Sequence, residues 1–254
     1  GKGHMTDKAI LDILQPVAPV DILWKPETFL PFHPNGMTFC SYDGEGRETD
    51  SWTVFSVGGG ALVDEKEAGC STMTPEVYPM THMTDILKWC ESNGRSYWEY
   101  VEMHEGPEIW DYLGKVWKAM KASISSGLER EGVLPGPLNL QRKAATYFIK
   151  ASGYKPSLQS RGLVFAYALA VSEENASGGK IVTAPTCGSC GVMPAVLYHL
   201  QQTRDFSDTR ILRALATAGL VGNIVKENAS ISGADVGCQG EVGVACAMAS
   251  AAAC

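Results

Sequence analysis

The middle of the chain contains a long helical repeat that constrains the fold more than any other feature. Beyond Pro107, apolar residues recur at spacings of three and four: Ile109, Leu113, Val116, Trp117, Met120, Ile124 and Leu128. This spacing places them on one face of an α-helix, which other elements must cover. Proline is favoured in the first turn of a helix. The segment therefore predicts a long core helix that begins near Pro107.

Weaker periodic segments predict further helices on both sides of this one. They lie between Thr6 and Pro16, at about 81–93, 141–152, 158–174, 192–202 and 208–220, and in the alanine-rich stretch from Val242 to the end. Ser96 and Glu99 have the spacing of a capping box, which marks a helix start.

Two β-like runs near the N-terminus, at 37–42 and 52–57, flank a polar stretch that contains glycine. Such a pattern is typical of a β-hairpin. No linker or repeat indicates an internal boundary. We therefore expect a mostly α protein, in which residues 6–254 form a single helical domain with a small N-terminal β-hairpin.

Composition excludes several classes of protein. Hydrophobic residues make up 45% and charged residues 19%, and the net charge is −7. An acidic chain is a poor binder of nucleic acid, and no apolar run reaches the ~18 residues that cross a bilayer. Residues 1–5 resemble a tag remnant, and no signal peptide follows them. Eight cysteines without a secretory segment then predict a cytoplasmic protein with reduced thiols.

A Cys-x-x-Cys motif occupies the segment 183–191, Thr-Ala-Pro-Thr-Cys-Gly-Ser-Cys-Gly. It precedes a predicted helix, whose N-terminus favours a thiolate or another anion. Cys187 and Cys190 could ligate metal, take part in redox chemistry or pack as small residues. Because the turn could also hold a substrate carboxylate, Thr186 and Ser189 are candidate substrate-binding residues.

A glycine-rich segment, 230–243, surrounds Cys238 with Asp, Gln and Glu side chains. Its glycines allow the backbone to approach a bulky group closely. Cys238 is therefore a candidate metal ligand, whereas Cys246 and Cys254 are expected to be buried small residues.

A histidine turn near the N-terminus offers another set of candidates. His33, in Phe-His-Pro-Asn-Gly-Met, precedes a strand, where it could act as a general base, donate a hydrogen bond or serve the structure alone. Asn35 is its neighbour in the turn. Ser56 and the triplet Gly58, Gly59 and Gly60 follow the second strand and could form an anion-binding nest or a plain turn.

In this order, from about residue 30 to the end, these motifs resemble the α (catalytic) domain of iron–sulfur L-serine dehydratases. Gly-Val-Leu-Pro-Gly at 132–136 and Ser-Gly-Ala-Asp-Val-Gly-Cys-Gln-Gly-Glu-Val-Gly at 232–243 are part of the resemblance. One departure is Cys187, where the family has asparagine.

The resemblance implies an L-serine ammonia-lyase that forms pyruvate and ammonia, with a [4Fe–4S] cluster held by three cysteines. Cys238 matches the first ligand, and the other two are expected beyond the last residue, as in a chain truncated at its C-terminus. The family's β domain is expected to be absent. His33 and Asn35 are the candidate catalytic residues, and a partner β subunit and self-association are expected.

Two alternatives stay open. The chain could be a non-catalytic or regulatory helical module. It could also be a pyridoxal-phosphate-dependent lyase, with the glycine triplet as phosphate loop and a lysine Schiff base, which predicts alternating strands and helices.

Overall fold

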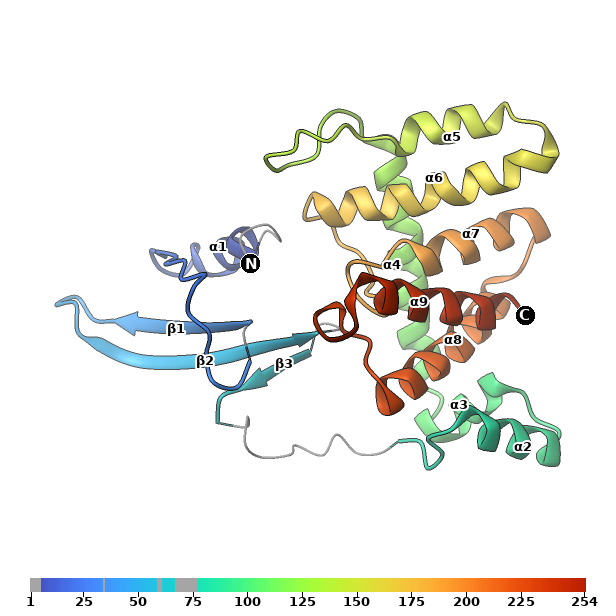
Figure 1. Ribbon diagram of the computed structural model, residues 1–254, viewed down its shortest axis with the longest axis horizontal. Helices are drawn as coiled ribbons and strands as arrows, with labels where there is room; N and C mark the ends of the chain where they lie inside the picture. Colours follow the sequence, from blue (N-terminus) through green and yellow to red (C-terminus); the bar gives the residue numbers. More distant parts are fainter. Residues whose placement is uncertain (1–5, 34, 59–60, 67–76) are drawn as a thin grey trace. The chain divides into compact units, whose positions relative to one another are not determined.

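The computed structural model describes residues 6–33, 35–58, 61–66 and 77–254 (Figure 1). These residues are mostly helical with a small N-terminal sheet, which confirms the predicted fold class. The chain divides into two compact units, Gly1–Thr74 and Pro75–Cys254. The expectation that residues 6–254 form a single domain stays a prediction.

The N-terminal unit contains one helix and an antiparallel sheet. Helix α1 spans Thr6–Leu14. Strands β1 (Gly36–Tyr42), β2 (Glu48–Gly58) and β3 (Ala61–Asp64) lie in the order β1-β2-β3. The pairing of β1 with β2 confirms the predicted hairpin, and β3 is an addition that the sequence pattern did not indicate.

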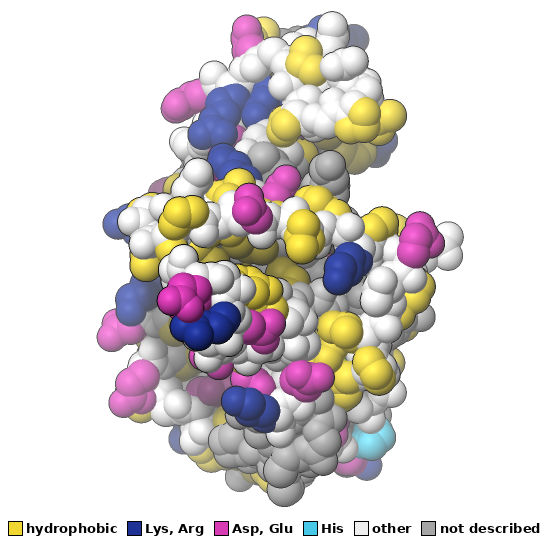
Figure 2. Space-filling view, turned by 90° about the vertical axis from the view of Figure 1, so that its left-hand side faces the viewer, with side chains coloured by type: hydrophobic (Ala, Val, Ile, Leu, Met, Phe, Trp, Pro, Cys, Tyr) yellow, Lys and Arg dark blue, Asp and Glu magenta, His cyan; other side chains and the backbone are white. Residues whose placement is uncertain are grey.

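The core of the N-terminal unit is small. Val54 and Phe55 of β2 are buried, and the ring of Phe32 lies 5.0 Å from that of Phe55. Several large apolar side chains of this unit stay exposed, among them Ile13, Val17, Leu23, Phe29 and Leu62. Figure 2 shows exposed hydrophobic side chains interspersed with acidic and basic ones on the face that it presents.

The second unit is a stack of helices. They are α2 (Met83–Asn93), α3 (Tyr97–Glu105), α4 (Ile109–Glu129), α5 (Ala144–Ser152), α6 (Pro156–Ala176), α7 (Val192–Arg204), α8 (Asp208–Asn228) and α9 (Gly233–Ala253). In Figure 1, α4 runs across the layer in which α5, α6, α7 and α8 are stacked. Contacts of α4 with each of these four helices make it the centre of the unit.

The predicted apolar face of α4 forms the core. Leu113, Trp117, Met120 and Ile124 are all buried, as the spacing predicts. Full burial of such a side chain contributes about 1.5–3 kcal/mol. At Gly127, a Cβ atom would lie 2.2 Å from the carbonyl oxygen of Ala170 in α6, so α4 and α6 are in backbone contact there.

Two helix starts show how side chains satisfy the first backbone amides. The capping box of α3 is confirmed, since the N–H of Ser96 donates to Glu99 at 2.8 Å. Helix α5 is capped from another helix: Glu173 of α6 accepts hydrogen bonds from the N–H groups of Lys143 (2.6 Å) and Ala144 (3.2 Å). This second cap joins α5 to α6.

The last helix begins earlier than the sequence predicts. Instead of starting at Val242, α9 starts at Gly233 and is kinked at Gly237, whose φ of 69° and ψ of 174° are not helical. The expectation that Cys246 and Cys254 are buried is wrong, because both lie on exposed positions. Among the described residues, no helix is both long and apolar enough to cross a membrane.

Candidate functional site

The histidine turn and the end of β2 lie together in the N-terminal unit. The backbone N–H of Asn35 donates to Nδ1 of His33 at 3.1 Å. The N–H of Ser56 in turn donates to the backbone carbonyl of Asn35 at 2.9 Å. His33 and Ser56 are half-buried and Asn35 is exposed. Three predicted site residues, separate in sequence, therefore form one hydrogen-bonded group.

The glycine triplet lies at the connection between two strands. Gly58 is the last residue of β2 and pairs with Ala61 of β3. Gly59 and Gly60 lie outside the described residues. Both the anion-binding nest and the plain turn therefore stay predictions.

The Cys-x-x-Cys turn lies in the second unit and leads into α7, as predicted. Thr186 and Ser189 are both buried, and their hydroxyl oxygens are 3.2 Å apart. The Thr186 hydroxyl also donates a hydrogen bond to the carboxylate of Glu241 in α9. These hydroxyls therefore bind other protein groups in this structure, and their role in substrate binding stays a prediction.

Glu241 joins the two motifs of the second unit. Its carboxylate is buried and accepts hydrogen bonds from the Thr186 hydroxyl and from the N–H of Gly188, the latter at 3.1 Å. A Cβ atom at Gly188 would lie 2.7 Å from this carboxylate, and one at Gly233 would lie 2.8 Å from it. The sequence analysis noted Glu241 only as a nearby polar group. The two glycines are the sequence signal that a bulky group is close.

The pKa values of both cysteines of the turn are raised, which favours the thiol over the thiolate. Burial, and after it the charge of Glu241, raises the pKa of Cys187. Cys190 is fully buried against Ile124 and Tyr167, and burial raises its pKa to about 12. The raised pKa values therefore disfavour the thiolate that was expected at this helix N-terminus. Each cysteine would have to lose its proton before it could act as a metal ligand or a nucleophile.

Cys238 is exposed and directly follows the kink at Gly237, where α9 resumes. It can therefore serve as a ligand to a group outside the helix. Among the described residues, however, no three His, Cys, Asp or Glu side chains gather in a way that could hold a metal ion. The described part of the chain thus offers Cys238 as a single ligand and does not fit a three-cysteine cluster by itself.

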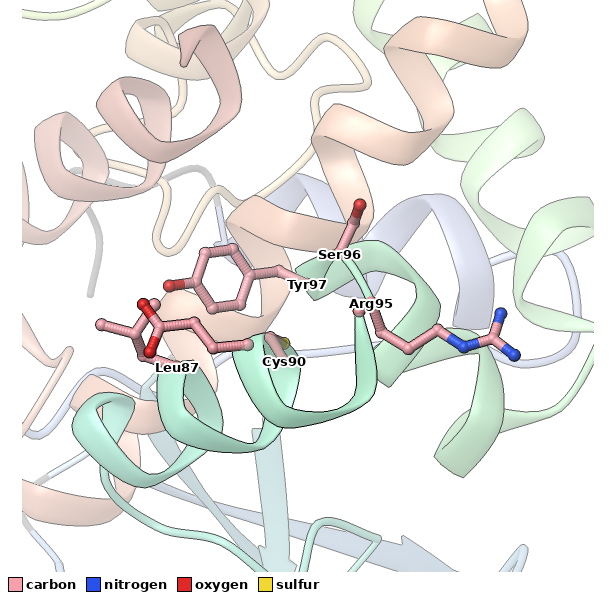
Figure 3. Close-up of a pocket in the computed structure, with 7 residues that line it drawn as sticks. Leu87, Cys90, Arg95, Ser96 and Tyr97 are labelled. Carbon is pink, nitrogen blue, oxygen red and sulfur yellow. The ribbon is translucent and has the colours of Figure 1, made fainter.

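A surface cavity of about 470 Å³ lies elsewhere, where α2 meets α3 (Figure 3). Leu87 and Cys90 of α2 and Tyr97 of α3 line it. The Arg95 side chain extends away from the Tyr97 ring and pairs with Glu99 at 2.7 Å. None of the predicted site residues lines this cavity, so it is separate from the motifs above.

Two family models match parts of this chain. The fold and motifs define a helical unit with a carboxylate-centred polar site, joined to a small β unit. The family model for the serine dehydratase alpha chain matches residues 60–254, and that for the serine dehydratase beta chain matches residues 14–67. The chain belongs to the serine dehydratase alpha chain family.

Three curated relatives show the same similarity. The L-serine dehydratase of Haemophilus influenzae is 44% identical over 239 residues, covering 88% of this chain and 52% of that protein. That of Streptomyces coelicolor is 42% identical (88% and 51% covered), and L-serine dehydratase 1 of Escherichia coli is 43% identical (87% and 51%). The chain spans about half the length of these relatives.

The beta-chain match corrects one expectation. The β domain was expected to be absent, yet residues 14–67 match its family model. His33, Asn35 and Ser56 fall in this match, whereas Thr186, Ser189 and Cys238 fall in the alpha-chain match. The candidate residues therefore come from both family segments rather than from the α domain alone.

Proposed function

We propose that this chain takes part in the conversion of L-serine to pyruvate and ammonia. The observation that carries the proposal is the meeting of the segments 183–191 and 230–243 at Glu241, within a chain that matches both serine dehydratase models. Two motifs that were linked only by resemblance are thus parts of one polar site.

The reaction needs a base, a proton donor for the leaving hydroxyl, and hydrogen-bond donors that hold the substrate carboxylate. A base takes the proton from Cα, the Cβ–O bond breaks, and the hydroxyl leaves as water once it has gained a proton. The aminoacrylate that results tautomerises, and water then releases ammonia and leaves pyruvate. His33 and Asn35 are the proposed catalytic residues, and the donors near Ser56 are proposed to bind the substrate carboxylate.

We also propose that Cys238 contributes one ligand to a [4Fe–4S] cluster. Its exposure directly after the kink of α9 supports the proposal, because a group outside the helix can reach the side chain. The described residues bring no two further ligands together with Cys238 in a group that could hold a metal ion.

The test is pyruvate formation from L-serine, after anaerobic incubation with iron(II) and sulfide, by a purified chain extended to the length of the curated relatives. Cys238→Ala is compared with Cys246→Ala, which changes another exposed cysteine of the same helix. We expect bound iron and pyruvate formation in the wild type and in Cys246→Ala, and the loss of both in Cys238→Ala. Pyruvate formation that is indifferent to Cys238 would leave the function standing and overturn the cluster ligand.

A non-catalytic module is the second candidate function. It is favoured by one observation, that the described residues gather no complete metal-binding set. Absence of pyruvate above background in every variant would overturn the proposed reaction and support this module. The pyridoxal-phosphate alternative predicts alternating strands and helices, whereas the second unit is helical throughout its regular elements.

A further inference from the structure

Glu241 has a buried carboxylate, and the sequence analysis gave this residue no catalytic, substrate-binding or metal-binding role. Burying a charged group is costly unless hydrogen bonds or opposite charges compensate for it. Here Oε1 of Glu241 accepts from both the Thr186 hydroxyl and the Gly188 N–H. Both donors belong to the turn before α7, so these hydrogen bonds join the carboxylate to that turn.

The position of Glu241 in α9 relates this contact to Cys238. The two residues are three positions apart in the helical segment that follows Gly237. Residues at this spacing lie on neighbouring positions of one helix face. A shift of the Glu241 carboxylate would therefore move the turn relative to the start of the segment that carries Cys238.

We propose that Glu241 is a positioning residue, which holds the turn of Thr186 and Gly188 in register with the Cys238 end of α9, and that Thr186 acts through it. The expected effect of Glu241 on catalysis rests on the proposed function. The contacts that carry the inference do not depend on that function. On this account Thr186 need not touch the substrate.

The glycines on both sides of the carboxylate support this role. A Cβ atom at Gly188 or Gly233 would lie within 3.0 Å of at least one Glu241 carboxylate oxygen, closer than real Cβ contacts allow. Gly243, in the same helix as Gly233, has nothing within 4 Å of its Cβ position. Of these three glycines, Gly188 and Gly233 approach the carboxylate this closely and Gly243 does not.

A double-mutant cycle on kinetics tests the inference. Glu241→Ala and Thr186→Val are each expected to lower kcat about 10- to 100-fold, since misplacement of a group at a site costs this much, with KM within about twofold. The double variant is expected to be no worse than the poorer single variant, because the two residues act as one unit. Thr186→Ser keeps the hydroxyl and should restore kcat. Multiplicative losses, or a KM effect confined to Thr186, would overturn the inference.

A second measurement does not need activity. The Glu241 charge is one cause of the raised pKa of Cys187, so Glu241→Gln should shift the pH profile of Cys187 alkylation to lower pH. Glu227→Gln, on an exposed position of α8, is the matched control and should leave the profile unchanged. An unchanged profile in Glu241→Gln would overturn the contact.

The kinetic and alkylation measurements distinguish failure of the proposed reaction from failure of the positioning role of Glu241. If no variant forms pyruvate, the proposed function fails, and the alkylation profile still decides the inference. If Glu241→Gln does not fold, Gly188→Ala is compared with Gly243→Ala by urea unfolding. We then expect a loss of stability only for Gly188→Ala, and equal stabilities would contradict the close approach.

Discussion

The backbone N–H of Asn35 donates a hydrogen bond to Nδ1 of His33. With Nδ1 as the acceptor, a neutral imidazole carries its proton on Nε2. In this arrangement Nε2 is a hydrogen-bond donor and does not take a proton. The structure therefore favours the donor over the general base for His33, two roles that the sequence left open.

A donor role makes a specific prediction for His33. His33→Ala should lower kcat for pyruvate formation about 10²- to 10³-fold, as does removal of one donor from other sites. His33→Gln keeps an N–H donor of similar reach and should lose less. His82→Ala, on an exposed position next to α2, is the control for the loss of a histidine. A Gln variant as poor as the Ala variant would instead indicate a proton acceptor.

The contact between α4 and α6 makes a prediction about stability. Gly127→Ala should lower the free energy of unfolding by about 1–3 kcal/mol, because its Cβ would meet the backbone of Ala170, which cannot yield. Gly114→Ala in the same helix meets nothing within 4 Å and should raise it by about 0.5–1 kcal/mol. Urea unfolding of both variants checks the difference, and equal effects would refute the backbone contact.

The cap that Glu173 provides for α5 predicts a cost on removal. Glu173→Ala leaves the N–H groups of Lys143 and Ala144 without their acceptor, which should lower the free energy of unfolding by about 1–3 kcal/mol. Glu173→Gln keeps an acceptor oxygen and should cost less. Glu129→Ala, an exposed change at the end of α4, should stay within about 0.5 kcal/mol. Indistinguishable values for the Glu173 and Glu129 variants would exclude a capping role.

An element could be predicted from the sequence where neighbouring residues determine it, and not where packing against distant residues does. The face of α4 was predictable because the spacing of Leu113 to Ile124 is itself the cause of the helix. Strand β3 has only four residues, too few to show an alternating pattern. The early start of α9 was missed because glycine disfavours a helix by about 1 kcal/mol per residue, so packing decides its conformation there.

The candidate site was predictable as a set of motifs but not as an arrangement. Cys238 and His33 could be selected from their neighbours in sequence. Glu241 could not be matched to Thr186, because the two residues are separated by 55 positions and no local pattern connects them. The protonated state of Cys190 likewise follows from burial between helices, which a turn sequence does not reveal.

His199 of α7 makes a pH prediction. It is buried, and this burial lowers its pKa below the usual value of about 6.5. Between the folded and the unfolded pKa, His199 is therefore protonated in the unfolded chain and neutral in the folded one. Stability from this residue is present above about pH 6.5 and lost as pH falls through the folded pKa.

The free energy of unfolding, measured by urea from pH 7.5 to 5, should therefore fall more steeply in the wild type than in His199→Gln. The Gln side chain can still hydrogen-bond Ser160, whose Oγ lies 2.7 Å from Nε2 of the histidine. His82→Gln, at an exposed position, should follow the wild-type curve. Parallel curves for the wild type and His199→Gln would show that His199 is not the titrating group.

The contact of Gly188 with Glu241 also bears on the order in which the chain folds. Helices α7 and α8 lie between these residues in sequence, so the hydrogen bond can form only after both helices have returned the chain to the turn. Contacts over such separations form late, since loop closure must come first. The Gly188 amide should then exchange with deuterium each time α9 detaches, even while α7 stays helical. A single backbone proton thus reports whether the last helix is docked.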